Sequence, residues 1–110
     1  MLNKIKFSPI SLHDLDEIWD YIALELCNLN AAENTVNGIM EIVEELKQFT
    51  GIGARLYFED GMDSGYRFVQ YKNYIAFYHI IGTTAYVDRV IYCKRDYMRA
   101  LFPEKPEDSI

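Results

Sequence analysis

The stretch that decides the fold is GYRFVQYKNYIAFYHIIGTTAYVDRVIYC, residues 65–93. It holds three runs rich in β-branched and aromatic residues, at 65–71, 74–81 and 85–93, and such runs are typical of strands. Two residues separate the first pair of runs and three separate the second. Because connections this short join antiparallel neighbours, the stretch predicts a three-stranded antiparallel meander.

Before the meander, the sequence predicts a short strand and two helices. The strand spans residues 5–8 and ends at Pro9, and Ser11 is expected to cap the first helix, with Asp14 completing a capping box. The second helix is expected over residues 31–49, after a turn at 28–30. Apolar residues recur three and four positions apart, so each helix is expected to bury one stripe. The stripes are Leu12, Leu15, Ile18, Trp19, Ile22 and Leu26, then Ala32, Val36, Ile39, Val43 and Leu46.

The remaining segments complete an α+β fold. Glycines and aspartates predict a loop over residues 50–64, with a short strand near 56–58. A short helix is expected over 95–102, and 103–110 is expected to be a flexible acidic tail. The predicted architecture is one domain, residues 1–102, in which an N-terminal strand and an antiparallel helical hairpin pack on one face of a twisted antiparallel sheet, with a short C-terminal helix. The opposite sheet face is expected to stay partly open.

Charge is distributed unevenly along the chain. The net charge is −6, and residues 1–49 hold nine acidic side chains against three basic ones. Residues 64–102 instead hold six basic side chains against two acidic ones. The basic residues of this second half are Arg67, Lys72, Arg89, Lys94, Arg95 and Arg99. The sequence therefore predicts an acidic helical side and a basic sheet surface that is available to another macromolecule.

No metal or cofactor site is predicted. Cys27 and Cys93 stand 66 positions apart with no Cys-x-x-Cys partner, and His13 and His79 are isolated, so both histidines are expected to be packed residues rather than ligands. The aspartates of the 50–64 loop lack the alternating acids and the terminal glutamate of a calcium loop. The chain has no run of 18 apolar residues, and residues 1–7 lack an export signal. We therefore expect a cytoplasmic protein without a membrane segment.

An ordered set of short motifs runs through nearly the whole chain. It consists of Phe7-Ser8-Pro9, Asp14-Leu15, Ile18, Tyr21-Ile22, Asn30-Ala31-Ala32, Gly53-x-Arg55, Tyr66-Arg67, Tyr74-Ile75-Ala76-Phe77-Tyr78 and Lys94-Arg95-Asp96-Tyr97. No single motif is specific, but the ordered set resembles the RelE/ParE toxins of bacterial type II toxin–antitoxin modules. The resemblance is closer to the ParE branch, the plasmid-stabilisation type. It implies a growth-inhibiting protein that a cognate antitoxin neutralises by covering its surface.

Two activities divide the family that the chain resembles. The RelE branch cleaves messenger RNA on the ribosome with basic and aromatic residues, and the ParE branch poisons DNA gyrase. Arg67 and Arg95 match basic positions of the nuclease branch. Ile75 stands where those nucleases carry an arginine, and Tyr92 stands where many members have histidine. Only Tyr92 and Tyr97 could replace the missing proton-transfer groups, and a tyrosine with a pKa near ~10 is a poor base at neutral pH.

These departures make a non-enzymatic, ParE-like toxin the leading interpretation, with DNA gyrase as its expected target. The alternative is a metal-independent, ribosome-dependent endoribonuclease that uses Arg67, Arg95, Tyr92 and Tyr97. A second alternative is a non-toxic binding module on the same scaffold, because most toxins of this kind are basic whereas this chain is acidic. Binding of the target or the antitoxin is predicted to involve basic side chains, which are Arg55, Arg67, Arg89, Lys94, Arg95 and Arg99.

Overall fold

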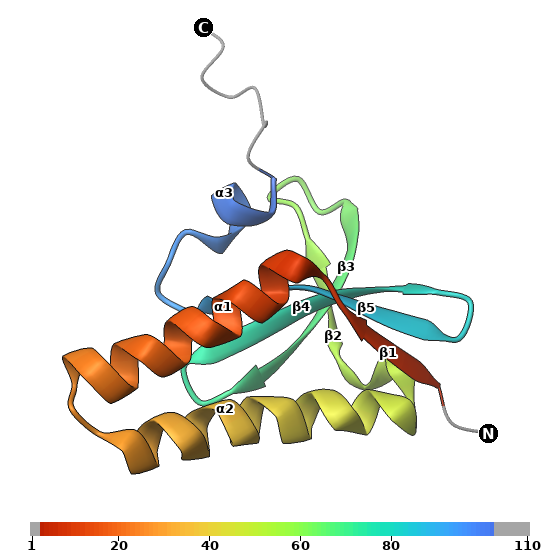
Figure 1. Cartoon of the computed structure of the whole chain (residues 1–110). Helices are drawn as coiled ribbons and strands as arrows, with labels where there is room; N and C mark the ends of the chain where they lie inside the picture. The colour runs from red at the N-terminus through yellow and green to blue at the C-terminus, as the bar shows by residue number, and fades with distance from the viewer. Residues whose placement is uncertain (1–2, 103–110) are drawn as a thin grey trace, which may run out of the picture.

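A computed structural model of the chain describes residues 3–102. It contains a five-stranded sheet in the order β1-β5-β4-β3-β2 with three α-helices (Figure 1). The predicted tail at 103–110 lies outside the described residues. The elements in chain order are β1 Lys4–Phe7, α1 Pro9–Asp20, η1 Tyr21–Glu25, α2 Leu29–Glu44, η2 Glu45–Lys47, η3 Thr50–Ile52, β2 Ala54–Tyr57, β3 Asp63–Tyr71, β4 Tyr74–Ile81, β5 Thr84–Tyr92 and α3 Tyr97–Leu101.

The predicted α+β architecture is confirmed, and the sheet is mixed. Strands β2 to β5 are antiparallel neighbours, as the meander requires. Strand β1 instead pairs in parallel with β5, with Lys4 opposite Thr84 and Phe7 opposite Val87. A parallel neighbour needs a long crossover, and α1, α2 and the other strands supply it. The fourth strand of the antiparallel part, β2, lies inside the predicted loop and covers 54–57 rather than 56–58.

The first helix begins earlier than the sequence predicts. Ser8, not Ser11, is the N-cap: its side chain accepts a hydrogen bond from the Ser11 amide at 2.9 Å, and Pro9 occupies the first turn, where a missing amide proton costs nothing. The predicted capping box is therefore wrong. Asp14 is buried and points away from the cap, toward β5.

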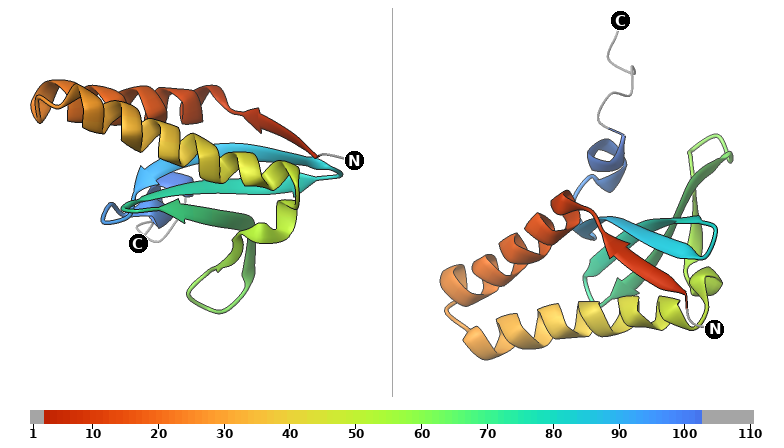
Figure 2. Two further views of the ribbon diagram at one scale, coloured as in Figure 1. Left: turned by 90° about the horizontal axis from the view of Figure 1, so that it is seen from below. Right: turned by 45° about the vertical axis from the view of Figure 1, so that its right-hand side comes forward.

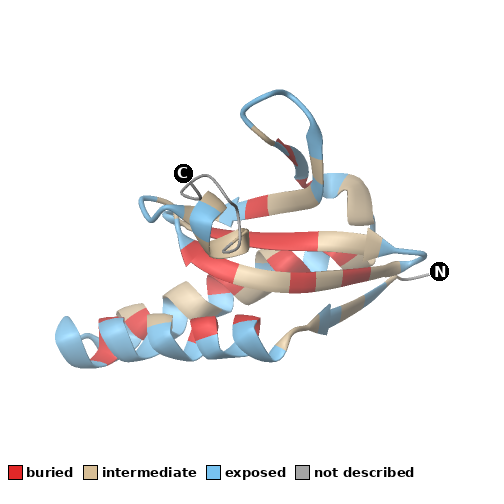
Figure 3. Cartoon of the chain, turned by 90° about the horizontal axis from the view of Figure 1, so that it is seen from above, coloured by how far each residue is buried: buried red, intermediate tan, exposed pale blue. Residues whose placement is uncertain are grey.

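The end of the first helix widens into one π-helical turn, η1, over Tyr21–Glu25. This turn shifts the apolar stripe that follows it, because each backbone amide in a π-helix bonds the carbonyl five residues earlier instead of four. Leu15 and Ile22 are buried as predicted, and Leu26 after the turn is exposed. Leu12 and Trp19, which precede the turn, are exposed on the regular part of α1. The tip of the helical hairpin thus presents apolar side chains to solvent (Figure 3). Its exposed large residues are Tyr21, Leu24, Leu26 and Leu29.

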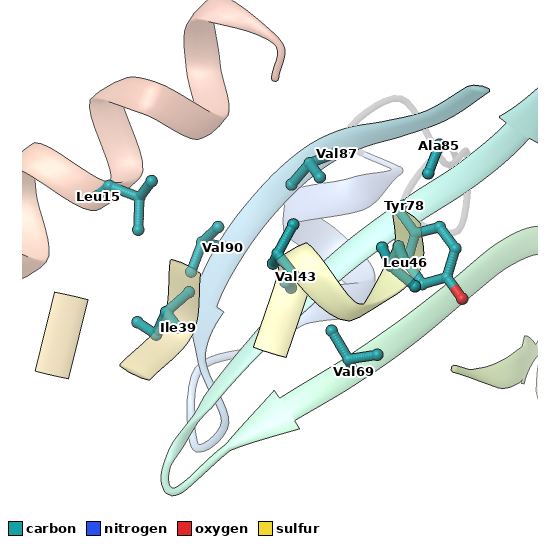
Figure 4. Packing of buried hydrophobic residues seen from close by; sticks show 10 residues of the cluster. Leu15, Ile39, Val43, Leu46, Val69, Tyr78, Ala85, Val87 and Val90 are labelled. Carbon is teal, nitrogen blue, oxygen red and sulfur yellow. The ribbon is translucent and has the colours of Figure 1, made fainter. Parts of the chain in front are cut away.

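The second helix forms the main core against the sheet. Its predicted stripe is confirmed at Ala32, Ile39, Val43 and Leu46, each at most 2% exposed. The ring of Tyr78 on β4 lies among valines of β3 and β5 under this helix (Figure 4). Gly38 lies so close to the Tyr71 ring that a Cβ atom built there would be 2.1 Å from Tyr71 Cζ. The helix can approach β3 at this point only because residue 38 has no side chain.

The opposite sheet face is covered at its centre by α3, which lies on the other side of the sheet from α1 and α2 (Figure 2). Phe77 is 1% exposed, and Ile75 and Ile91 are also buried under Tyr97, Met98 and Leu101. The centre of the sheet face that was expected to be partly open is therefore closed, and the side chains buried there are apolar rather than basic. The C-terminal segment supplies its own apolar cover for this second core.

The Tyr78 hydroxyl fixes the loop that follows α2. It accepts a hydrogen bond from the Gly53 amide at 3.0 Å and donates one to the Thr50 carbonyl at 2.6 Å. Burial raises the pKa of Tyr78, so the hydroxyl stays protonated and able to donate. One phenol oxygen in the main core thus bonds two backbone groups of the loop at 50–53, and Arg67 bonds two more.

Removal of that oxygen tests its contribution. We expect Tyr78→Phe to lower the free energy of unfolding by about 1.5 kcal/mol, because two backbone groups near the core lose their partner. Urea denaturation followed by circular dichroism measures the change. Tyr57→Phe is the control, because Tyr57 is exposed, and it should leave the midpoint unchanged. Equal stability of Tyr78→Phe and the unmodified chain would contradict this role.

Candidate partner-binding site

A groove of about 520 Å³ lies between the end of α1 and the adjoining ends of β4 and β5. We call it the α1 groove. Its walls combine apolar side chains with a few charged groups, which is typical of sites that orient a partner segment. The lining residues are Asp14, Glu17, Ile18, Tyr21, Leu26, Tyr74, Val90, Ile91, Tyr92 and Arg95.

A buried ion pair supports the groove from below. The Arg89 guanidinium donates through Nε to Asp14 Oδ2 at 2.8 Å and through Nη2 to Asp14 Oδ1 at 3.0 Å. The Val90 amide donates to the same carboxylate at 2.9 Å. The hydrogen bond to Asp14 raises the pKa of Arg89, so the guanidinium stays charged. Arg89 thus joins β5 to α1, and its side chain is only 18% exposed.

Two tyrosines form the wall at the end of the sheet. The rings of Tyr74 and Tyr92 are cross-strand neighbours with centroids 5.7 Å apart. Burial raises the pKa of Tyr74, and Tyr92 and Tyr21 add to the shift. The Tyr74 hydroxyl therefore remains protonated at neutral pH and can donate a hydrogen bond, but it cannot act as a base.

One cation stands at the mouth of the groove. Arg95 follows β5, its amide donates to the Tyr92 carbonyl at 2.9 Å, and its side chain is exposed. Among residues 3–102, no carboxylate forms an ion pair with it. The groove continues into the apolar hairpin tip through Tyr21 and Leu26. An apolar channel with a cation at one end fits an amphipathic peptide segment that carries an acidic side chain.

The other predicted site residues lie elsewhere. Arg55 and Arg67 line a second, smaller cleft at the far end of the sheet. Tyr97 packs against Phe77 on the opposite sheet face, with ring centroids 5.3 Å apart. Arg99 forms an ion pair of 3.5 Å with Asp96, and Lys94 is exposed in the turn before α3.

The four residues of the predicted nuclease set are therefore not assembled at one place. Arg95 and Tyr92 share the α1 groove, whereas Arg67 lies in the second cleft and Tyr97 lies under the opposite face. The prediction that one basic surface holds Arg67 and Arg95 together is wrong. The reason is strand register: Arg67 is opposite Tyr78, on the α2 side of the sheet beside the loop at 51–53, whereas Arg95 follows the end of β5 at Tyr92.

The histidines are not buried in an apolar core. His79 is partly exposed, and its Nδ1 lies 2.5 Å from Asp88 Oδ2. The Tyr86 ring stacks on the imidazole, with the two ring centroids 5.2 Å apart. His13 is on the surface beside Glu17 at 3.2 Å. Over the described range 3–102, no three His, Cys, Asp or Glu side chains are placed to share a metal ion. No helix of that range is long and apolar enough to cross a membrane.

Sequence reasoning missed several residues of the α1 groove. Glu17, Tyr21 and Leu26 line it, although Leu26 was expected to be buried. The π-helical turn that exposes Leu26 leaves no clear sequence signal. Asp14 was assigned to a helix cap because it stands three residues after Ser11, and only the fold brings it to Arg89, which is 75 positions away.

The comparisons with known proteins agree with this fold. Residues 5–97 match the sequence profile described as "ParE toxin of type II toxin-antitoxin system, parDE". The chain belongs to the ParE toxin family. The region that matches the ParE profile runs from the second residue of β1 to the first residue of α3.

Two solved structures share the ParE-type fold. A chain of the chromosomal ParDE toxin–antitoxin system from P. aeruginosa is 24% identical with a TM-score of 0.68, and the match covers 84% of this chain and 97% of that one. A chain of the toxin–antitoxin complex RelBE2 from Mycobacterium tuberculosis is 18% identical with a TM-score of 0.59, and the match covers 84% and 99%. No curated protein sequence is significantly similar to the chain.

Proposed function

We propose that this chain is a growth-inhibiting toxin that acts by binding a protein target, DNA gyrase, and that a cognate antitoxin neutralises it by placing an amphipathic segment in the α1 groove. The observation that carries the proposal is the α1 groove itself, with apolar walls that continue into an exposed apolar tip and with Arg95 at its mouth. The proposed target implies a cytoplasmic location. The ParE family model and the dispersed nuclease residues both support a binding mechanism rather than catalysis.

Expression of the chain alone tests the toxic activity. We expect growth to stop on induction in a bacterial host, purified chain to block supercoiling by purified gyrase, and cellular transcripts to remain intact. Cut messenger RNA with normal supercoiling would overturn the proposal in favour of an endoribonuclease. Unchanged growth at full expression would instead identify a non-toxic binding module.

A matched pair of variants tests the antitoxin site. Leu26→Glu puts a charge into the α1 groove, and Leu12→Glu puts the same charge on the exposed surface of α1 outside it. Both positions are about half exposed, 56% and 49%, so both variants should fold. On co-expression with the adjacent antitoxin gene, we expect growth to be restored for Leu12→Glu but not for Leu26→Glu. Equal rescue of both variants would place the antitoxin elsewhere.

A further inference from the structure

Two arginines of neighbouring strands face each other at the end of the sheet far from the α1 groove. Arg55 on β2 and Arg67 on β3 are direct register partners, so their side chains leave the same face of the sheet. Like charges in this position repel and destabilise a strand pair. Both side chains line a cleft of about 200 Å³, which we call the arginine cleft. Its other lining residues are Asp63, Gly65, Tyr66 and Ile80.

The chain neutralises only part of this charge. Arg55 Nη1 donates to Asp63 Oδ2 at 3.1 Å. Arg67 uses only Nη1, which donates to the uncharged carbonyls of Gly53 at 2.8 Å and Gly51 at 3.4 Å. Its Nε and Nη2 groups have no acceptor within residues 3–102. Two cations therefore face one carboxylate, and a guanidinium offers five N–H donors in all.

Asp63 shows how a carboxylate is held in the arginine cleft. Its Oδ1 accepts the Gly65 amide at 2.8 Å while its Oδ2 meets Arg55. The hydrogen bond from the Gly65 amide lowers the pKa of Asp63 most; burial opposes this shift, and Arg55 and then Arg67 lower the pKa further by smaller amounts. The same face thus stabilises one negative oxygen pair and leaves the donors of Arg67 available for a second.

We propose that Arg55 and Arg67 form a receptor for one acidic side chain of the antitoxin. This side chain docks in the arginine cleft and neutralises the positive charge that Asp63 leaves unpaired. The identity of this partner depends on the proposed function, but the carboxylate site does not. The rigid donor fork of arginine matches the two oxygens of a carboxylate. The cleft is separate from the α1 groove, so the antitoxin contacts both ends of the sheet.

The surroundings favour a protein carboxylate over a nucleic acid. Glu59 and Asp60 lie in the turn of the same β2–β3 hairpin and are exposed. A nucleic acid brings a row of phosphates and requires several cations along its path, whereas the adjoining hairpin turn offers acids and no further cation. A single carboxylate needs only the local pair of arginines.

Nuclear magnetic resonance of the arginine Nε–Hε groups in the full chain tests the receptor. The probe is a blocked octapeptide of serine and alanine with one central glutamate, and its control has glutamine at that position. We expect the glutamate peptide to shift the Arg55 and Arg67 signals saturably at millimolar concentration, and the glutamine peptide to leave them unchanged. A single-stranded RNA octamer at 0.15 M salt is expected to bind the cleft more weakly than the glutamate peptide.

Four variants test whether the peptide binds in the arginine cleft. Arg55→Gln and Arg67→Lys should each weaken peptide binding about tenfold, because each loses a charge-assisted contact. Asp63→Asn should strengthen it several-fold by removing the competing carboxylate, and Lys4→Gln on the opposite edge strand β1 should have no effect. The proposal is overturned if both peptides give equal shifts, if Arg55→Gln and Asp63→Asn bind like the unmodified chain, or if RNA saturates the two arginines first. None of these readouts depends on toxicity, so a failure here is distinct from a failure of the proposed function.

Discussion

Replacing Asp14 by alanine is expected to lower the free energy of unfolding by about 3 kcal/mol or more, because the Arg89 guanidinium then stays buried without its counter-charge. Asp14 is 4% exposed and accepts three hydrogen bonds, two from Arg89 and one from the Val90 amide. The variant loses the link between α1 and β5 at the floor of the α1 groove. Urea denaturation at pH 7 measures the loss.

Two further variants separate the buried pair from ordinary helix effects. Glu17→Ala removes a surface carboxylate of the same helix that pairs with exposed His13 and attracts Arg89 only weakly, and it should change stability by less than about 0.5 kcal/mol. Asp14→Ala combined with Arg89→Met should recover part of the loss, since no unpaired charge then remains. If Asp14→Ala is as stable as Glu17→Ala, the ion pair does not hold α1 to the sheet.

Replacing Gly38 by alanine is expected to cost about 2 kcal/mol, although alanine is the better helix former. The new methyl group would lie 2.1 Å from Tyr71 Cζ and 2.5 Å from both neighbouring ring carbons. Tyr71 packs against the main core, so its ring cannot move away without opening that packing, and overpacking of this kind destabilises by about 1 to 3 kcal/mol. Thermal denaturation of the two proteins gives the difference.

The sign of this effect depends on the tyrosine ring. In a Tyr71→Ala background the same Gly38→Ala change should become stabilising by about 0.5 to 1 kcal/mol, because only the helix propensity of alanine remains. Double-mutant analysis measures this coupling directly. A similar cost in both backgrounds would show that the strain arises within the helix and not against β3.

The spacing of residues along the chain predicted those elements whose formation depends mainly on nearby residues. The three central strands and the buried stripe of α2 follow directly from the spacing of β-branched and apolar residues. The parallel position of β1 could not be predicted in this way, because its partner β5 is about 80 residues away. The cover that α3 places over Phe77 was missed because five helical residues carry little periodic signal.

The sequence indicated which residue types line the clefts, but not where in the fold these residues lie. Several of the predicted arginines and tyrosines line concave surfaces, but the fold divides them between two clefts. Residue type indicates which interactions a side chain can make. Which side chains meet is decided by strand register and by the covering helix, and register depends on long-range packing.

The pairing of β1 with β5 also sets the order of events during translation. The first strand leaves the ribosome early, but its partner is made about 80 residues later, which takes roughly 4 to 16 s at typical elongation rates. Until then β1 has no partner strand, and Asp14 lacks the Arg89 and Val90 groups of β5 that bond it. The mixed sheet can therefore close only after synthesis is nearly complete.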